Sequence, residues 1–261
     1  MPLWDNEINI ALKAAKKAGH AIMDIYESGD ICVSAKNDRS PVTKADLAAG
    51  EIITGILSRE FPGYPILCED NRDDKKRHER EICWIVDPLD GTKEFIKRNG
   101  EFTVNIALVY RNEAVAGVIY VPVKDIMYRA SKNNGAWMQG KRIRVSDRDK
   151  DIVMAVSRSH ITDSERKLIE DNDIKKVISA GSSIKGCLVA EGICDVYYRF
   201  GPTMEWDTAA MQCIVEEAGG IFRQLDDTPM TYNRINSVNS KGFYAVNSSK
   251  NILHGRSDKW I

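Results

Sequence analysis

The chain has 261 residues, of which 43% are hydrophobic, which is enough to bury a large core in one or two globular domains. Its 37 Lys and Arg residues balance 38 Asp and Glu residues, so the formal net charge is −1. This balance excludes a global basic field that would attract nucleic acid or an anionic membrane, and an anionic ligand must therefore be met by a local group of cations.

The N-terminus carries Asp5 and Glu7 ahead of its apolar positions, which does not fit a secretory signal peptide, and no apolar run reaches the length of a membrane span. Six cysteines are scattered without a C-x-x-C pair or a histidine spacing typical of zinc: Cys32, Cys68, Cys83, Cys187, Cys194 and Cys213. We therefore expect reduced, mostly buried thiols, no transmembrane segment and a cytoplasmic protein.

Two helices and two short strands are predicted in the first third of the chain. The first helix has apolar residues three or four apart, at Ile8, Leu12, Ala15, Ala18, Ile22 and Ile25. The second helix lies within 41–63 and ends at a Pro-Gly pair. Strands follow at 64–70 and 81–87, each with acids at its C-terminal end, and the highly charged run 71–81 between them is expected to be a solvated loop.

Residues 102–146 are predicted to form an antiparallel meander, because alternating apolar runs are broken by turn clusters at 111–113, 122–125 and 132–135. After about residue 150 strands and helices alternate. We therefore expect an α/β protein with an α+β portion at 1–150, an α/β portion at 151–261, and the functional site between them.

The motif DPLDGT begins at Asp87, directly after the predicted strand 82–86. A turn would return Asp90 beside Asp87, Gly91 would allow close approach of the backbone, and Thr92 would begin a helix whose free amides suit an anion. Two carboxylates next to an anion site favour Mg²⁺, which commonly joins carboxylates to a phosphate. The alternative is a turn that only caps a helix.

Three further acids are candidate ligands or catalytic groups, and each has a structural alternative. Asp207, in the segment MEWDTAAMQC, occupies an expected N-cap position. Glu69 follows a strand, where a solvated loop residue is common. Asp46 lies three residues after Thr43, a spacing that resembles a capping box with Asp in place of Glu.

Taken together, DPLDGT, the downstream EWDTAA, the earlier T-x-A-D segment and the strand ending in Glu-Asp resemble the lithium-sensitive, magnesium-dependent phosphatase superfamily of inositol monophosphatase and fructose-1,6-bisphosphatase. The stretches DPLDGTKEF and GSSIKGCLVAEG are most similar to CysQ-type 3′(2′),5′-bisphosphate nucleotidases, because inositol monophosphatases typically have Asn where this chain has Glu94. The chain departs from the family pattern at Met211, which replaces a small residue, and at Cys68, where many relatives have an acid or a serine. The resemblance implies a layered αβαβα sandwich.

The resemblance also implies a catalytic centre with two or three Mg²⁺ ions. Its ligands would be four carboxylates and one backbone carbonyl: Glu69, Asp87, Asp90, Asp207 and the carbonyl of Leu89. Asp46 and Thr92 would orient and deprotonate the attacking water. The amides of Gly91 and Thr92 would hold phosphate oxygens, with Asp207 also beside the substrate.

Specificity is expected to come from the second half of the chain. Ser182 and Lys185 at a predicted helix start, with Arg199 on the next strand, would bind a non-scissile 5′-phosphate. His160 matches a nucleotide-contacting histidine of the subfamily, although an ordinary loop histidine is the alternative.

The implied reaction is Mg²⁺-dependent hydrolysis of the small molecule adenosine 3′,5′-bisphosphate to AMP and phosphate, with its 5′-phosphosulfate analogue as another substrate. One alternative is an inositol or sugar phosphatase of the same superfamily, and another is a non-catalytic nucleotide-binding regulator. The sequence leaves the oligomeric state open, since relatives include monomers and dimers. It also encodes nothing of the peripheral attachment to the inner membrane described for some CysQ-type relatives.

Overall fold

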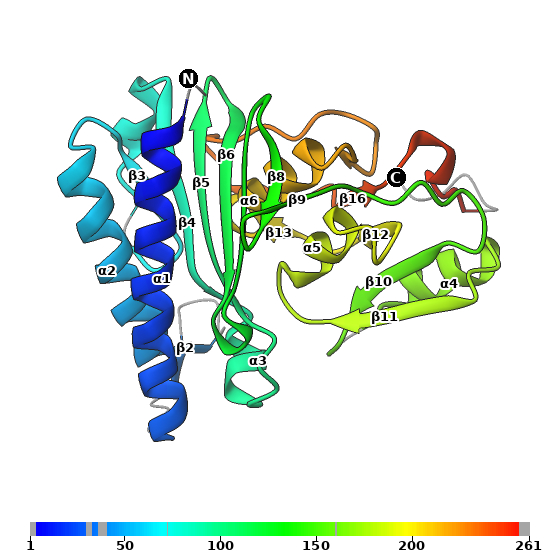
Figure 1. Cartoon of the computed structure of the whole chain (residues 1–261), viewed down its shortest axis with the longest axis horizontal. Helices are drawn as coiled ribbons and strands as arrows, with labels where there is room; N and C mark the ends of the chain where they lie inside the picture. The colour runs from blue at the N-terminus through cyan, green and yellow to red at the C-terminus, as the bar shows by residue number, and fades with distance from the viewer. Residues whose placement is uncertain (1–3, 30–32, 36–40, 72, 160, 256–261) are drawn as a thin grey trace.

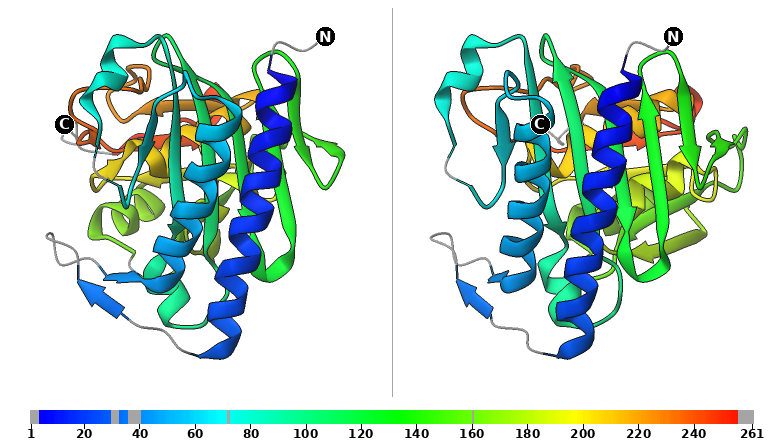
Figure 2. Two further views of the ribbon diagram at one scale, coloured as in Figure 1. Left: turned by 90° about the vertical axis from the view of Figure 1, so that its left-hand side faces the viewer. Right: turned by 60° about the vertical axis from the view of Figure 1, so that its left-hand side comes forward.

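The computed structural model describes residues 4–29, 33–35, 41–71, 73–159 and 161–255. Five layers follow one another across the molecule (Figure 1). Helices α1 (Asp5–Ser28) and α2 (Lys44–Glu60) lie side by side on one face of a seven-stranded sheet, as Figure 2 shows. Helices α5 (Ile184–Ala190) and α6 (Glu205–Glu217) lie between this sheet and a five-stranded sheet, whose far face is covered by α4 (Asp163–Asp171). The predicted αβαβα sandwich is confirmed.

The seven-stranded sheet has the order β3-β4-β5-β6-β7-β8-β9. Its strands are β3 (Ile66–Cys68), β4 (Ile82–Asp90), β5 (Thr103–Tyr110), β6 (Glu113–Val121), β7 (Ile126–Ser131), β8 (Gly135–Met138) and β9 (Lys141–Ile143). Strand β3 is parallel to β4 and every later neighbour is antiparallel, so the predicted meander is confirmed. The β5–β6 turn places Arg111 and Asn112 at φ 49° and 65°, as a tight two-residue hairpin requires.

The five-stranded sheet has the order β11-β10-β12-β16-β14. Its strands are β10 (Val153–Ser157), β11 (Lys176–Ala180), β12 (Val196–Arg199), β14 (Ile221–Gln224) and β16 (Phe243–Val246). Strand β10 is parallel to β11 and β12, whereas β16 is antiparallel to β12 and β14. Two small ribbons pair β1 (Val33–Ala35) with β2 (Pro41–Thr43), and β13 (Thr203–Met204) with β15 (Val238–Asn239). The short helices are α3 (Thr92–Ile96), η1 (Lys75–Glu79), η2 (Pro122–Lys124) and η3 (Ser249–Asn251).

The two-residue period of the strands divides the core into layers. On β4, Cys83 and Ile85 join the cluster that contains α5 and α6, whereas Trp84 and Val86 join the cluster beneath α1 and α2. Because the inner cluster continues from β4 through α6 to the second sheet, the sequence portions before and after residue 150 share one core. The division into portions 1–150 and 151–261 stays a prediction.

Most described residues of the charged run 71–81 are exposed, as predicted for a solvated loop, but the prediction is wrong at Arg77. The run contains η1, and Arg77 is fully buried at 0% exposure. The Arg77 guanidinium donates to Asp73 at 2.7 Å and to the side-chain oxygen of Asn233 at 2.7 Å. Hydrogen bonds to another part of the chain therefore hold a segment whose sequence is typical of solvent exposure.

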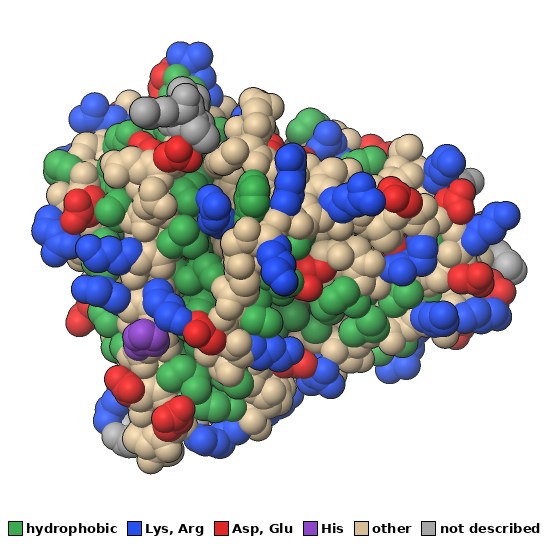
Figure 3. Space-filling view, viewed as in Figure 1, with side chains coloured by type: hydrophobic (Ala, Val, Ile, Leu, Met, Phe, Trp, Pro, Cys, Tyr) green, Lys and Arg blue, Asp and Glu red, His purple; other side chains and the backbone are tan. Residues whose placement is uncertain are grey.

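The structure confirms the predicted burial of the cysteines that it describes, which are Cys68, Cys83, Cys187, Cys194 and Cys213. Burial raises the pKa of the Cys83 thiol to about 12, so this thiol stays protonated at neutral pH. Cys32 lies outside the described residues. Within the described ranges, every helix is too short or too polar to cross a membrane. Acidic and basic side chains are interspersed over the face in Figure 3, as the balanced charge predicts.

Candidate active site

Three aspartates from two distant segments meet at one edge of the seven-stranded sheet. Asp87 and Asp90 belong to β4, and Asp207 belongs to the first turn of α6. One carboxylate oxygen from each lies within 4.8 Å of the others. Asp87 is buried, whereas Asp90 and Asp207 are partly exposed. The predicted cluster of Asp87, Asp90 and Asp207 is therefore present.

A β-bulge brings the two acids of β4 together, and the predicted turn between them is wrong. Asp87 lies opposite Asn105 on β5, whereas Asp90 lies opposite Thr103, so three steps along β4 match two along β5. In a regular strand, residues three apart point to opposite faces. The extra residue of the bulge returns both carboxylates to one side.

The carboxylate of Asp90 accepts hydrogen bonds from a residue in the second half of the chain. Its Oδ2 accepts from the backbone N–H of Ser183 at 2.7 Å and from the Ser183 hydroxyl at 2.6 Å. Asn105 also donates to this oxygen, at 3.2 Å. Ser183 and Asn105 were not among the site residues predicted from the sequence. The double serine before a predicted helix marked this position, but the prediction named Ser182.

Asp207 caps its own helix and also joins the acidic cluster. The helix begins at Glu205, so Met204 is the N-cap and the predicted N-cap position of Asp207 is wrong. Asp207 is instead the third helical residue, and its Oδ2 accepts from the Met204 N–H at 2.7 Å. This bond corresponds to the acidic half of a capping box, and it leaves the other oxygen for the cluster.

The cluster is electrostatically unfavourable without a cation. Burial raises the pKa of Asp87 well above its ordinary range, and the neighbouring Glu69, Asp90 and Asp207 raise it further. Burial and the charge of Asp90 raise the pKa of Asp207 to about 8. Several carboxylates that repel one another, with only hard oxygen donors, fit a divalent cation such as Mg²⁺.

Glu69 reaches this cluster because β3 and β4 run parallel. It directly follows β3, and its N–H donates to the carbonyl of Val86 at 3.2 Å. Its carboxyl hydrogen-bonds Asp87 and raises that residue's pKa. The structure therefore places the predicted fourth acid beside the buried aspartate of the cluster.

Asp46 makes both the capping-box contact and the contact to Thr92, which were predicted as alternatives. Its Oδ2 accepts from the Thr43 N–H at 2.8 Å and from the Thr43 hydroxyl at 2.6 Å, which completes a capping box. Its Oδ1 accepts from the Thr92 hydroxyl at 3.0 Å. Burial raises the pKa of Asp46, the bonds from Thr43 oppose this shift, and the charge of Asp70 adds to it.

Gly91 sits where the chain leaves the bulge and enters α3. Its φ of 95° lies in the left-handed region, and a Cβ there would come within 3.2 Å of the Ser182 Cβ and 3.3 Å of the Glu101 carbonyl oxygen. A larger residue would therefore be strained and crowded. Thr92 begins α3 as predicted, and its hydroxyl also lies 3.4 Å from the Leu89 carbonyl oxygen.

The predicted phosphate-binding residues border the cluster. Helix α5 begins at Ile184, two residues later than predicted, and Ser182 precedes it at φ 45°. Among the described residues, the buried hydroxyl of Ser182 has no hydrogen-bond partner. Such an orphaned polar group is rare and suits a ligand contact.

Lys185 is buried at 6% exposure, and its Nζ donates to the Ser182 carbonyl at 2.7 Å. Burial lowers the pKa of Lys185 to about 8; the charge of Asp90 opposes this shift and that of Arg199 adds to it. The charge of Arg199 also opposes the raised pKa of Asp207, so both cations interact electrostatically with the acidic cluster. His160 lies outside the described residues.

The comparisons with known proteins agree with this geometry. The model of the inositol monophosphatase family matches residues 3–254. The 3′(2′),5′-bisphosphate nucleotidase CysQ of Buchnera aphidicola is 40% identical over 93% of this chain and 94% of its own length. CysQ of Escherichia coli strain K12 is 41% identical over 88% of this chain and 95% of its own.

Solved structures agree as well. CysQ from Bacteroides thetaiotaomicron superposes with a TM-score of 0.83 at 41% identity, covering 94% of this chain and 98% of its own. The extragenic suppressor protein suhB from Bartonella henselae superposes with a TM-score of 0.81 at 30% identity, covering 94% and 95%. Fold, motifs and relatives coincide over nearly the whole length, and this chain belongs to the inositol monophosphatase family.

Proposed function

We propose that this chain is a Mg²⁺-dependent phosphatase that hydrolyses the 3′-phosphate of adenosine 3′,5′-bisphosphate to AMP and phosphate. The observation that carries the proposal is the cluster of Asp87, Asp90 and Asp207 beside the Asp46–Thr92 pair. The choice of nucleotide is supported by relatives at 40% and 41% identity that are named 3′(2′),5′-bisphosphate nucleotidases.

The carboxylates would hold two or three Mg²⁺ ions. The proposed ligands are the side chains of Glu69, Asp87, Asp90 and Asp207 with the carbonyl of Leu89. Magnesium bound by this set supplies stabilisation of the negative charge on the phosphate and acidifies water. The acidic residues themselves gain from the cation, because it removes the repulsion that raises the pKa values of Asp87 and Asp207.

The residues around the cluster would activate water and hold the phosphate. The Thr92 hydroxyl donates a hydrogen bond to Asp46, so its oxygen lone pairs can accept a hydrogen bond from water. The water oxygen attacks phosphorus, its proton passes through Thr92 to Asp46, and the bond from phosphorus to the 3′-oxygen breaks. The leaving oxygen is protonated from solvent. The raised pKa of Asp46 makes it a stronger base than an ordinary aspartate.

The 5′-phosphate would be bound by Ser182, Lys185 and Arg199, with His160 contacting the nucleotide. Lys185 carries its charge below its pKa of about 8, so it is cationic at neutral pH. The hydroxyl of Ser182 would find its hydrogen-bond partner in the substrate. The 5′-phosphosulfate analogue carries a phosphate at the same position and is proposed as a second substrate. The cytoplasmic location stays a prediction, and the comparisons give no support to peripheral attachment at the inner membrane.

The test is phosphate release from adenosine 3′,5′-bisphosphate and inositol 1-phosphate, measured side by side with Mg²⁺ and with EDTA. We expect a strong preference for the nucleotide and no release in EDTA. Preference for the inositol ester would retain the metal chemistry and reject the roles of Lys185 and Arg199. Absence of turnover with either substrate would contradict the proposal and favour a non-catalytic nucleotide-binding regulator.

A further inference from the structure

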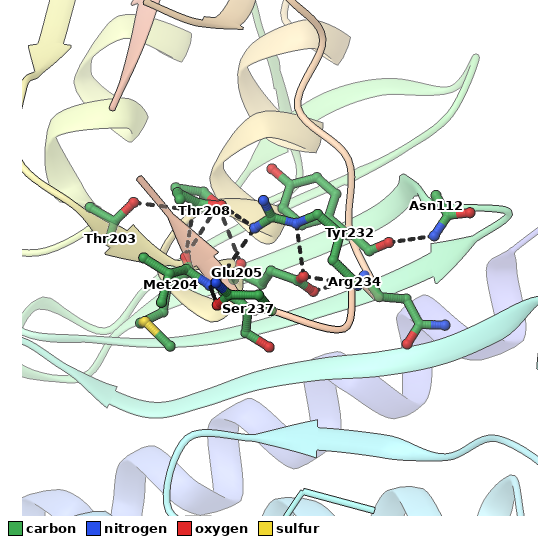
Figure 4. Close-up of polar contacts among 12 residues, drawn as sticks. Asn112, Thr203, Met204, Glu205, Thr208, Tyr232, Arg234 and Ser237 are labelled. Atoms are coloured by element: carbon green, nitrogen blue, oxygen red, sulfur yellow. Dashed lines mark hydrogen bonds and ion pairs between the residues drawn. The ribbon is translucent and has the colours of Figure 1, made fainter. Parts of the chain in front are cut away.

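A buried carboxylate connects the start of α6 to a distant segment of the chain. Glu205 is the first residue of α6 and is 0% exposed. Its Oε2 accepts from the N–H of Asn233 at 2.7 Å, and its Oε1 accepts from the N–H and the Nε of Arg234, both at 3.0 Å (Figure 4). Segment 232–239 therefore supplies these hydrogen-bond donors and the cation that pairs with Glu205.

Segment 232–239 also hydrogen-bonds the start of α6 through the side chain of Asn239. Arg234 donates through Nη2 to the side-chain oxygen of Asn239 at 2.5 Å. The amide of Asn239 donates in turn to the Met204 carbonyl at 2.8 Å and to the Thr208 hydroxyl at 3.1 Å. The first turn of α6, which contains Asp207, is thus bonded at residues 204, 205 and 208.

Segment 232–239 also hydrogen-bonds the connection between Glu69 and β4, the strand that carries Asp87 and Asp90. Arg77 lies between Glu69 and β4, and its guanidinium donates to the Asn233 side chain at 2.7 Å and to the Arg234 carbonyl at 2.9 Å. Asn233 donates back to the Arg77 carbonyl at 3.1 Å. One segment therefore ties the connection that follows Glu69 to the helix that carries Asp207.

We propose that segment 232–239 is a positioning element of the metal site, in which Arg234 and Glu205 fix the location of the Asp207 carboxylate. This inference rests on the proposed Mg²⁺ dependence. Asp207 must be held against the repulsion of Asp87 and Asp90 before a cation arrives, and the bonds at residues 204, 205 and 208 oppose that displacement. Groups that orient a ligand without touching the metal typically change metal affinity by about 10–100-fold when removed.

The test compares Glu205→Gln with Glu216→Gln. Glutamine keeps the shape of Glu205 but turns an amide N–H₂ toward backbone N–H donors. Glu216 is a matched control, because it lies on the same helix and pairs with the Nη1 of Arg223 at 2.9 Å, far from Asp207. Two readouts are measured in each variant: the Mg²⁺ concentration for half-maximal phosphate release, and the rise of the unfolding midpoint on adding Mg²⁺ without substrate.

We expect Glu205→Gln to raise the Mg²⁺ requirement by about tenfold or more and to shrink the Mg²⁺-dependent rise of the midpoint. Glu216→Gln should leave both at the values of the unmodified protein. If both variants lower the midpoint in EDTA alike and neither changes the Mg²⁺ requirement, the role of Glu205 is only structural and the inference is overturned.

A second variant covers the case in which Glu205→Gln does not fold. Arg234→Lys keeps a cation for Glu205 and loses the forked contact to Asn239, so it should give a smaller shift in the same direction; no shift would overturn the inference. The proposed function fails separately if the unmodified protein shows a Mg²⁺-dependent midpoint without hydrolysing the nucleotide. No Mg²⁺ response in the unmodified protein would overturn both.

Discussion

The hydroxyl of Thr92 donates a 3.0 Å hydrogen bond to one carboxylate oxygen of Asp46, whose other oxygen is occupied by Thr43. The capping box therefore does more than begin α2, because it fixes the orientation of the carboxylate toward Thr92. A base that is held by its own helix loses little entropy when it acts on a proton. The structural and the proposed catalytic roles of Asp46 are compatible for this reason.

Asp46→Asn should reduce kcat by about 10²–10⁴-fold with little change in KM, because the amide keeps the size of the side chain and cannot accept the proton of water. Steady-state rates with adenosine 3′,5′-bisphosphate measure this. Thr43→Val is the control, since it removes the cap hydroxyl and leaves the Thr92 contact. Thr43→Val should lower the free energy of unfolding by about 1 kcal/mol and should reduce kcat far less than Asp46→Asn does. Equal losses of kcat in the two variants would assign Asp46 a structural role alone.

The stability of the metal-free protein should fall as the pH rises from about 4 to about 8. Folding raises the pKa of Asp207 from its ordinary value of 3.8 to about 8. Between these values the folded state binds more protons than the unfolded state, so the free energy of unfolding decreases with increasing pH. Unfolding midpoints across this range in EDTA measure the slope, and Mg²⁺ should flatten it.

The control for this pH dependence is Asp207→Asn, which removes one titrating carboxyl and should give a shallower slope in EDTA. A midpoint in EDTA that rises with pH, or that follows the same course with and without Mg²⁺, would contradict the interpretation of the acidic cluster as a cation site.

The KM for adenosine 3′,5′-bisphosphate should rise as the pH passes above about 8, because Lys185 then loses the charge that would bind the 5′-phosphate. Rates from pH 7 to 9.5 at saturating Mg²⁺ test this. Lys185→Gln should have a high KM at every pH and lack this rise. Inositol 1-phosphate has no second phosphate and serves as the matched substrate. If its KM rises equally with pH, the titrating group acts on the scissile phosphate or the metals.

Arg77→Ala should destabilise the protein by about 3 kcal/mol or more, since it leaves Asp73 and the side-chain oxygen of Asn233 without their buried cation. Chemical denaturation in EDTA measures the loss. Arg59→Ala is the control, because Arg59 is 66% exposed and pairs with its exposed neighbour Glu60, and it should cost less than about 1 kcal/mol. A loss for Arg77→Ala as small as that of the control would show that segment 71–81 is not held by this residue.

Structural features that depend on local sequence patterns were predicted correctly. The meander and the alternating second half follow from apolar periodicity and turn residues, and strand and helix propensities act over only a few residues. The acidic motif at Asp87 was found because it follows an apolar strand. The burial of Arg77 within the charged segment was not predicted, because its partners Asn233 and Ser237 lie 156 and 160 residues away. No local pattern distinguishes an arginine that meets such partners from one in solvent.

The sequence by itself determined the elements, their order and the identity of the acids, because side-chain periodicity and motif chemistry are local properties. Only the tertiary structure decided how these acids meet. The bulge in β4 turns Asp90 to the side of Asp87, and the packing of α6 on the first sheet brings in Asp207. The Ser183 hydroxyl then hydrogen-bonds Asp90, and segment 232–239 hydrogen-bonds Glu205 at the start of α6. Such contacts depend on the register of paired strands and on buried hydrogen bonds between distant segments, and neither is encoded in any short stretch of residues.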